Sequence, residues 1–386
     1  MIFKKLAKFA LALVAAGTLF AAHAQAPAPA TVTVGFNGPL TGSASSWGIG
    51  MSEGMKMAFS DLGTVRIGAT PYRFVLDALD NGYNTQTAVA NSLRLIQEKN
   101  VKFIATLGGS IAVATEPVMS SAKVLQFHLG AAEAFLGKDK PFSLRSNMSS
   151  LDSGYVYWPW VAQKYPQIKS VALFLPNDDT GRATQLHEEA AIRKTRLTLT
   201  ASERVPRDVT DFYPILTKVL ATKPDALSFA TPPGQQPIAA KQARELGFKG
   251  VIMLPAMEAG SVIAAMGPQA DGILNTIGLT YPMTERARKV HTQWVTSRKS
   301  APPAMLLDGY NIGEMLVHAA VASGTVEDTT AVYNALQKLP FNDTVFGKAC
   351  WHDVKGINNA MIYALAITTI RNGREELVDI AKPPCK

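Results

Sequence analysis

The sequence lacks the motifs that mark most hydrolases and cofactor-dependent enzymes. His187-Glu188-Glu189 has no second histidine at the spacing of a zinc-binding HExxH helix, and the serines near Trp47 do not form a G-x-S-x-G elbow. The glycines of Gly48-Ile49-Gly50 and Gly54 are one residue too widely spaced for a dinucleotide-binding loop, and they favour loop flexibility and helix packing. We therefore expect no catalytic residues, cofactor or metal, and an enzyme is the weakest functional hypothesis.

Basic clusters and long apolar runs are scarce as well. The net charge is +8 without a concentrated basic segment, which argues for solubility and against nucleic-acid binding. Beyond the N-terminal segment, no apolar run approaches the roughly 20 residues that span a bilayer. The longest run, Met361 to Ile370, is interrupted by threonines and predicts a strand or a buried helix.

The N-terminus has the three parts of a secretory signal peptide. Lysines before residue 9 form a basic region, Leu6 to Ala22 is apolar, and Ala22-His23-Ala24 is a small-x-small cleavage site. No cysteine follows the apolar region, so a lipid anchor is not indicated, and the short run disfavours an uncleaved membrane anchor. We expect cleavage of residues 1–24 and a periplasmic protein that begins at Gln25.

Only two cysteines occur, Cys350 and Cys385, and both lie near the C-terminus. In an oxidising compartment such a pair predicts a disulfide, worth about 3–4 kcal/mol on the chain-entropy model. Two unrelated thiols are the alternative.

Short apolar runs alternate with amphipathic helical segments through most of the chain. Strands are expected at residues 32–36, 73–76, 103–107, 124–127, 171–175, 226–230 and 251–254. This alternation, in a chain too long for one core, predicts an α/β protein with two doubly wound Rossmann-like lobes. Beyond Tyr281 the pattern predicts helices at 285–298, 305–322 and 331–338, without new strand pairs, that return to cover the first lobe.

No low-complexity linker separates the lobes, so the crossings between them are expected to be short and suited to a hinge. We place these crossings near Asn147, Thr280 and Gly347. The N-terminal lobe is then residues 31–147 and 281–347, and the C-terminal lobe is residues 148–280 and 348–386.

The segment from Val101 to Ala114 has a strand, a glycine turn and a helix start in immediate succession. The turn is Gly108-Gly109-Ser110. Free N–H groups and the positive end of a helix dipole favour a carboxylate at such a position. The alternative is a tight βα turn with no ligand. Nearby, His128 is the only histidine expected beside a strand end in the cleft, and a hydrogen-bonded or solvated histidine is favoured over a catalytic one.

Several motifs together resemble the branched-chain amino-acid-type periplasmic solute-binding proteins of ABC transporters. They are Gly35-Phe36-Asn37-Gly38-Pro39-Leu40-Thr41-Gly42 with Trp47-Gly48, Asp80-Asn81 before Thr87-Ala88-Val89-Ala90, Gly108-Gly109-Ser110, Gln242-Ala243-Arg244-Glu245-Leu246-Gly247, Gly309-Tyr310-Asn311 and Phe346-Gly347-Lys348. The resemblance implies two lobes, three hinge crossings and a ligand cleft at the carboxyl ends of both sheets. It also implies a monomer that closes on a small solute and delivers it to an ABC permease. A sensory receptor that presents its ligand-bound lobes to a membrane kinase is the alternative.

The resemblance also implies a set of ligand-binding positions. In this sequence they are Trp47, Gly108, Gly109, Ser110, Gly130, Ala131 and Ala132 in the first lobe, and Asp178, Thr180, Pro232 and Glu258 in the second. Two aromatic residues of the family pattern are missing, at Thr180 and at Pro232 or Pro233, and Glu258 is out of register.

Small residues opposite Trp47 leave room for a flat or bulky ligand such as an aromatic carboxylate. An amino acid is the alternative, because Asp178 or Glu258 would supply a partner for its ammonium group.

Overall fold

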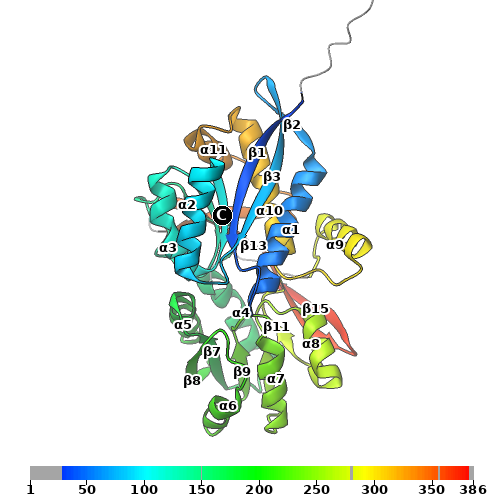
Figure 1. Ribbon diagram of the computed structural model, residues 1–386. Helices are drawn as coiled ribbons and strands as arrows, with labels where there is room; N and C mark the ends of the chain where they lie inside the picture. The colour runs from blue at the N-terminus through cyan, green and yellow to red at the C-terminus, as the bar shows by residue number, and fades with distance from the viewer. Residues whose placement is uncertain (1–27, 149, 279–280, 355–356, 382–386) are drawn as a thin grey trace, which may run out of the picture.

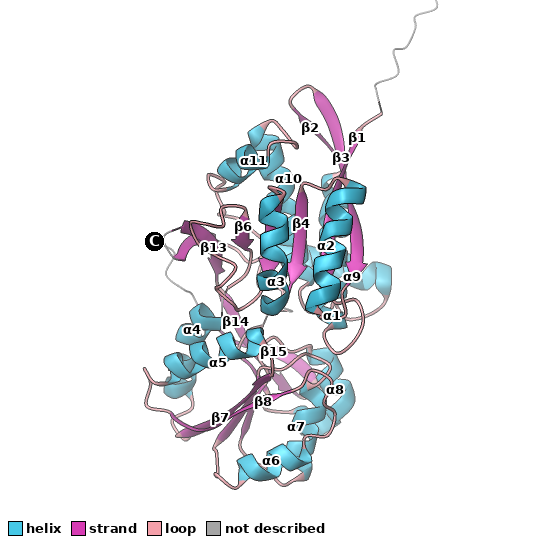
Figure 2. Ribbon diagram, turned by 60° about the vertical axis from the view of Figure 1, so that its left-hand side comes forward, coloured by secondary structure: helices cyan, strands magenta, loops and turns pink. Residues whose placement is uncertain are grey.

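The protein is built from two α/β lobes that lie one above the other (Figure 1). The computed structural model describes residues 28–148, 150–278, 281–354 and 357–381. Each lobe has one sheet of mostly parallel strands with helices packed against it (Figure 2), as the alternating sequence pattern predicts.

The first sheet has the strand order β12-β13-β6-β5-β4-β1-β3-β2. Its strands are β1 (Ala30–Gly38), β2 (Thr64–Ile67), β3 (Thr70–Asp80), β4 (Phe103–Leu107), β5 (Leu125–Leu129), β6 (Ser143–Arg145), β12 (Ala349–Val354) and β13 (Ile357–Tyr363). The central strands β3, β1, β4, β5 and β6 are parallel. All five residues of β4 and of β5 are buried, as expected for strands covered on both faces.

The second sheet has the order β15-β14-β11-β10-β9-β7-β8. Its strands are β7 (Ser170–Pro176), β8 (Thr198–Val205), β9 (Ala226–Phe229), β10 (Val251–Met253), β11 (Leu274–Asn275), β14 (Leu365–Arg371) and β15 (Arg374–Ala381). The five strands β7 to β11 are parallel. The antiparallel hairpin of β14 and β15 extends the sheet at one edge.

Helices follow most of the parallel strands and cover both sheets. They are α1 (Ser45–Leu62), α2 (Thr85–Lys99), α3 (Gly109–Ser121), α4 (Ser150–Lys164), α5 (Asp179–Ile192), α6 (Tyr213–Leu220), α7 (Gln236–Glu245), α8 (Ala259–Met266), α9 (Glu285–Arg298), α10 (Leu306–Ser323) and α11 (Thr329–Leu336), with a short 3-10 helix at Gly267–Ala270. Several begin at a side-chain cap: Asn84 accepts from the Thr87 N–H, and Asp178 accepts from the Gly181 N–H.

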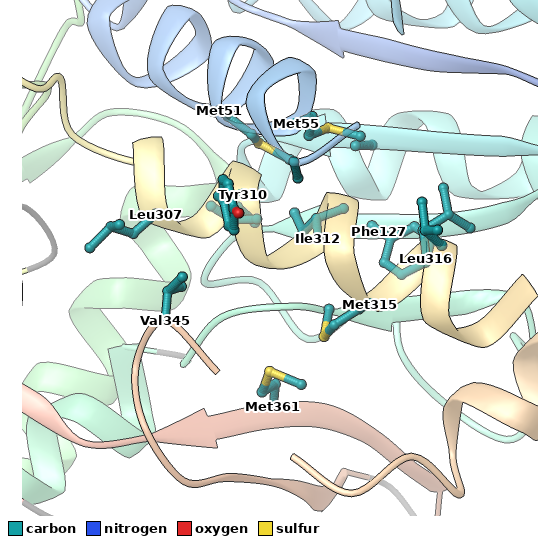
Figure 3. Packing of buried hydrophobic residues seen from close by; sticks show 14 of the residues in the cluster. Met51, Met55, Phe127, Leu307, Tyr310, Ile312, Met315, Leu316, Val345 and Met361 are labelled. Carbon is teal, nitrogen blue, oxygen red and sulfur yellow. The ribbon is translucent and has the colours of Figure 1, made fainter. Parts of the chain in front are cut away.

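The helices α1 and α10 are packed unusually closely in the first lobe (Figure 3). A Cβ on Gly50, Gly54 or Gly309 would lie 2.0–2.1 Å from a backbone oxygen of the facing segment. Glycine is therefore required where the two backbones meet. This explains the glycines near Trp47 as helix packing, while the expected loop flexibility is wrong because α1 already begins at Ser45.

The helices after residue 281 return to the first lobe, as the sequence predicts. Val290 and Trp294 of α9, most of the apolar face of α10, and Leu336 of α11 belong to the same core as β1 and β4. In Figure 1 the orange helices α10 and α11 accordingly lie beside the blue and cyan part of the chain.

The prediction that no new strand pairs follow residue 281 is wrong. Four strands, β12 to β15, form two hairpins, and the run from Met361 to Ile370 is divided between β13 and β14 at Ala364. Because β12 and β13 extend the first sheet and β14 and β15 the second, the third crossing lies between Tyr363 and Leu365, not at Gly347. Asn147 lies between β6 and α4, and Thr280 is outside the described residues.

Cys350 lies in β12, on the first sheet. No cysteine among the described residues is free, but Cys385 lies outside them, so its pairing with Cys350 stays a prediction. Within the described ranges, no helix combines the length and the apolar character that crossing a bilayer requires.

Candidate functional site

A cavity of about 160 Å³ lies between the two lobes. It is bounded at the carboxyl ends of the strands: Ala131 follows β5, Pro176 ends β7, and Thr231 follows β9. In open α/β sheets this edge is the usual place for a ligand. The lining also includes Trp47, Asn147, Met148, Ser153, Thr180, Thr184, Glu188, Arg207, Ala230, Pro255, Ala256, Ile277, Met305, Tyr363 and Leu365.

Most of the cavity wall is apolar. Trp47 comes from the first turn of α1, and Met305 immediately precedes α10. The Tyr363 ring stacks on Phe346 with centroids 4.1 Å apart, and its hydroxyl donates to Asp308 Oδ1 at 3.0 Å. Complete burial raises the pKa of Asp308 to about 7. The stacking on Phe346 and the hydrogen bond to Asp308 together fix the orientation of the Tyr363 ring.

Arg207, just after β8, is the one basic side chain that the described residues contribute to the lining. Its Nε donates to Asp178 Oδ2 at 2.6 Å, and its guanidinium carbon lies 3.7 Å from the centroid of the Tyr83 ring. The side chain is only 16% exposed, and Nη1 and Nη2 are buried without a partner anywhere in the described chain. Burying N–H groups without an acceptor costs free energy, and an anion bound at Nη1 and Nη2 would remove that cost.

Two further polar atoms in the wall are buried and without a hydrogen-bond partner in the described ranges. They are the Trp47 Nε1–H, which only donates, and the Thr231 hydroxyl, which donates or accepts. Both offer a polar contact to a ligand that is mostly apolar.

Among the residues that the structure describes, Glu188 is the one acidic member of the lining, and it is 3% exposed. Its Oε2 accepts hydrogen bonds from the Tyr157 hydroxyl and from Trp158 Nε1. Burial raises the pKa of this carboxyl to about 7, although both donors act to lower it.

The predicted Gly108-Gly109-Ser110 turn connects β4 to α3, but in this structure it contacts the second lobe instead of lining the cavity. The Ser110 N–H donates to Thr180 Oγ1 at 3.1 Å, and the Tyr83 hydroxyl lies 3.3 Å from the same oxygen. Gly108 has φ +109°, and a Cβ there would meet the Tyr83 hydroxyl at 2.5 Å. The hydroxyl of Thr180 thus sits where the sequence predicts a ligand carboxylate.

Of the predicted site residues, Trp47, Ala131 and Thr180 meet at the cavity. Gly130 and Ala132 pack against Gly109, just behind the wall. Gly130 to Ala132 and the Gly108-Gly109-Ser110 turn thus lie together near Thr180.

The remaining predicted residues serve other contacts. Asp178 holds Arg207 and caps α5. The backbone oxygen of Pro232 accepts from Gln235 N–H at 2.9 Å, and its neighbour Thr231 lines the cavity instead. Glu258 accepts from the Ala304 N–H of the first lobe at 3.0 Å.

The sequence-based prediction did not include Arg207 or Glu188. Arg207 follows β8, a strand that was not predicted, so its position at a strand end was not visible. Glu188 had a signal: Thr180, Thr184 and Glu188 are spaced by four residues and share one face of α5.

His128 is a hydrogen-bonded core residue, as expected. Its Nδ1 lies 2.5 Å from Thr106 Oγ1, and its Nε2 lies 2.9 Å from Gln126 Oε1. Burial lowers its pKa to about 3, so the ring is neutral. Elsewhere in the described residues, no three histidine, cysteine or acidic side chains come together in a way that could hold a metal ion.

The sequence matches one family of known proteins, and the fold matches several solved structures. Residues 31–375 match the family model described as periplasmic binding protein. No curated protein matches the sequence.

Solved structures share the fold at low sequence identity. A leucine-binding protein, LivK, from Thermotoga maritima is 19% identical with a TM-score of 0.80, over 91% of this chain and 99% of that one. A Rhodopseudomonas palustris ABC transporter solute-binding protein in complex with benzoate is 14% identical with a TM-score of 0.81, over 92% and 97%. Another from Rhodopseudomonas palustris BisB5, in complex with 3,4-dihydroxybenzoic acid, is 18% identical with a TM-score of 0.79, over 92% and 98%.

Proposed function

The chain belongs to the periplasmic binding protein family, and from this premise we propose that it is a receptor that closes on a small organic carboxylate and delivers it to an ABC permease in the inner membrane. We infer that the carboxylate binds to Arg207, in the cavity between the lobes.

The observation that supports this proposal is the buried, unpartnered guanidinium of Arg207. Its Nη1 and Nη2 are the donors that a carboxylate accepts from in a bidentate pair, and both lack a partner among the described residues. Asp178 and the Tyr83 ring already fix the plane of the guanidinium, so little side-chain freedom would be lost on binding.

An aromatic body fits the remainder of the cavity better than an α-amino acid. Trp47, Met148 and Tyr363 give an apolar wall that suits a ring. The acids expected to hold an ammonium group are otherwise engaged, Asp178 by Arg207 and Glu258 by the Ala304 N–H. Glu188 also lines the cavity, but it lies more than two helical turns along α5 from Asp178, away from the ammonium group that an α-amino acid carries beside its carboxylate. Benzoate and 3,4-dihydroxybenzoate, the ligands of two structural neighbours, belong to the chemical class that we propose.

Export is part of the same proposal. We infer that residues 1–24 are removed and that the mature protein acts in the periplasm as a monomer. Sequencing the N-terminus of periplasmic material is expected to give Gln25 first, and a retained Met1 in the membrane fraction would contradict this.

Calorimetry with matched pairs tests the ligand class. Benzoate and benzamide have nearly the same shape, but only benzoate carries the anion. We expect benzoate and its ring-substituted relatives to bind and the amides to bind at least about tenfold more weakly. At a hundredfold excess over its dissociation constant, a bound carboxylate should stabilise the protein by about 2.7 kcal/mol. Equal affinity for acid and amide, or binding of leucine alone, would overturn the proposal.

A further inference from the structure

We propose that Glu188 is a second recognition residue, which accepts a hydrogen bond from an amino or hydroxyl group at the end of the ligand remote from its carboxylate. This inference rests on the proposed function, because Arg207 defines the carboxylate end. It narrows the ligand class to carboxylates that carry a hydrogen-bond donor on the opposite side of an apolar body.

The position of Glu188 along α5 supports a polar group at each end of the cavity. Arg207 is bonded to Asp178, the residue that caps the N-terminus of α5. Thr180, Thr184 and Glu188 then line the cavity at intervals of four residues. With a rise of about 1.5 Å per residue, Glu188 lies roughly 12 Å along the helix axis from Thr180. A ligand held by Arg207 and extended along α5 therefore points its far end toward Glu188.

The bonding of the Glu188 carboxyl leaves one oxygen for a ligand. Both protein donors, the Tyr157 hydroxyl and Trp158 Nε1, bond to Oε2. Within the described chain, no hydrogen bond reaches Oε1. A carboxylate that is 3% exposed and half satisfied is costly, and a donor from a ligand would remove part of that cost. The raised pKa of this carboxyl agrees with such an incomplete shell of donors.

The two aromatic donors also make Glu188→Gln an informative variant. Trp158 Nε1–H can only donate, so it requires an oxygen opposite it. The amide introduced by Glu188→Gln must therefore keep its oxygen toward Trp158 and Tyr157 and turn its NH₂ group toward the cavity. The substitution preserves the contacts to α4 and replaces an acceptor by a donor at the ligand.

The test compares aminobenzoates with fluorobenzoates by calorimetry at about pH 8, where Glu188 is mostly ionised. The ring amino group donates a hydrogen bond but is a poor acceptor. Fluorine is of similar size and cannot donate. The 3- and 4-substituted pairs are both used, because either position could point toward Glu188. The wild-type protein should prefer one amino compound over its fluoro partner by about tenfold. Glu188→Gln should abolish or reverse this preference, while its fluorobenzoate affinity stays within about twofold.

The control is Glu189→Gln, the same change at the next residue. Glu189 accepts from Gln185 and pairs with Arg193 outside the cavity lining, so the amino preference should remain. Equal wild-type affinity for the amino and fluoro compounds, at both positions, would overturn the role of Glu188 even if Glu188→Gln failed to fold. If no benzoate bound at all, the proposed function would fail first, and the two failures are therefore distinguishable.

Discussion

At the scale of single residues, the site combines positions that the sequence indicates with positions that only the folded chain brings together. Trp47 and Thr180 follow from the resemblance and lie at the cavity. Arg207 does not, because its role depends on Asp178 from another loop and on Tyr83 from the other lobe. Contacts between segments this far apart in sequence leave no local pattern, so no periodicity could have predicted them.

Replacing Arg207 by glutamine should remove the preference for carboxylates. The variant keeps two donors but loses the charge, and a hydrogen bond to a charged group contributes about 1.5–3 kcal/mol. We expect benzoate affinity to fall by roughly tenfold to a hundredfold and the difference between benzoate and benzamide to disappear, as measured by calorimetry. Arg204→Gln, at an exposed position of β8 three residues before Arg207, is the matched control and should bind like the wild type. An unchanged acid-to-amide ratio in Arg207→Gln would show that the carboxylate binds elsewhere.

His128 should make the protein less stable in mild acid. Its pKa is lowered to about 3 by burial, from an ordinary value of 6.5, so the unfolded chain binds a proton that the folded chain excludes. The contribution of the neutral ring is fully present above about pH 6.5 and is lost as the pH falls toward 3, by about 1.4 kcal/mol per pH unit.

Urea unfolding between about pH 7 and pH 5 measures this effect. In His128→Gln the fall in unfolding free energy should be shallower, because the amide does not titrate. His352→Gln, at an exposed histidine of β12, is expected to keep the wild-type slope. If unfolding free energy fell equally steeply with pH in His128→Gln and the wild type, His128 would not be a source of the acid sensitivity.

At the scale of helices and strands, the sequence predicts the elements that have a clear period or a buried apolar run. The strand Phe103–Leu107 and the helix Glu285–Arg298 have the predicted bounds. The pairs β12–β13 and β14–β15 were missed because the apolar run from Met361 to Ile370, predicted as one strand or one buried helix, crosses from one sheet to the other without a turn signal. A single residue, Ala364, separates the two strands, and pairing with distant partners decides where each belongs.

The contact between α1 and α10 should be intolerant of a single methyl group. In Gly54→Ala or Gly309→Ala the new Cβ would lie about 2 Å from a backbone oxygen, so one helix must move away from the other. Overpacking of this kind costs about 1–3 kcal/mol or more, measured as the free energy of urea unfolding. Gly260→Ala in α8 is the control, since its Cβ meets only Ala301 at 3.5 Å, and it should be neutral or slightly stabilising. Equal stability of Gly54→Ala and Gly260→Ala would disprove the close contact.

At the scale of the whole molecule, the corrected position of the third crossing changes which parts of the chain the predicted disulfide would join. Cys350 lies in the first sheet, whereas the chain reaches Cys385 after β15 of the second sheet. A bridge would therefore connect the two lobes near the hinge. Mass spectrometry of periplasmic protein without reductant should show two hydrogens fewer than the reduced chain, and reduction should lower stability by about 3–4 kcal/mol. Two alkylatable thiols in native material would contradict the bridge.

The lobes also meet through a small set of polar contacts on the cleft side. Thr180 of the second lobe contacts Ser110 and Tyr83 of the first, and Ser43 Oγ donates to the Arg207 backbone oxygen at 2.7 Å. Polar contacts of this kind form only while the lobes are together, so a ligand that adds contacts to both lobes can shift the balance between an open and a closed state.

Removing the Thr180 hydroxyl should shift the ligand-free protein toward an open state. Thr180→Val keeps the shape of the side chain but leaves the Ser110 N–H without its acceptor when the lobes close. The loss of about 1–2 kcal/mol from the closed state should weaken ligand binding by roughly fivefold to thirtyfold, because only the closed fraction binds tightly. Small-angle scattering of the ligand-free variant should give a larger radius of gyration than the wild type, and saturating ligand should restore it. Thr217→Val, whose hydroxyl bonds only within α6, should change neither quantity. If Thr180→Val weakened binding without any change in the ligand-free radius, Thr180 would act on the ligand directly and not on lobe closure.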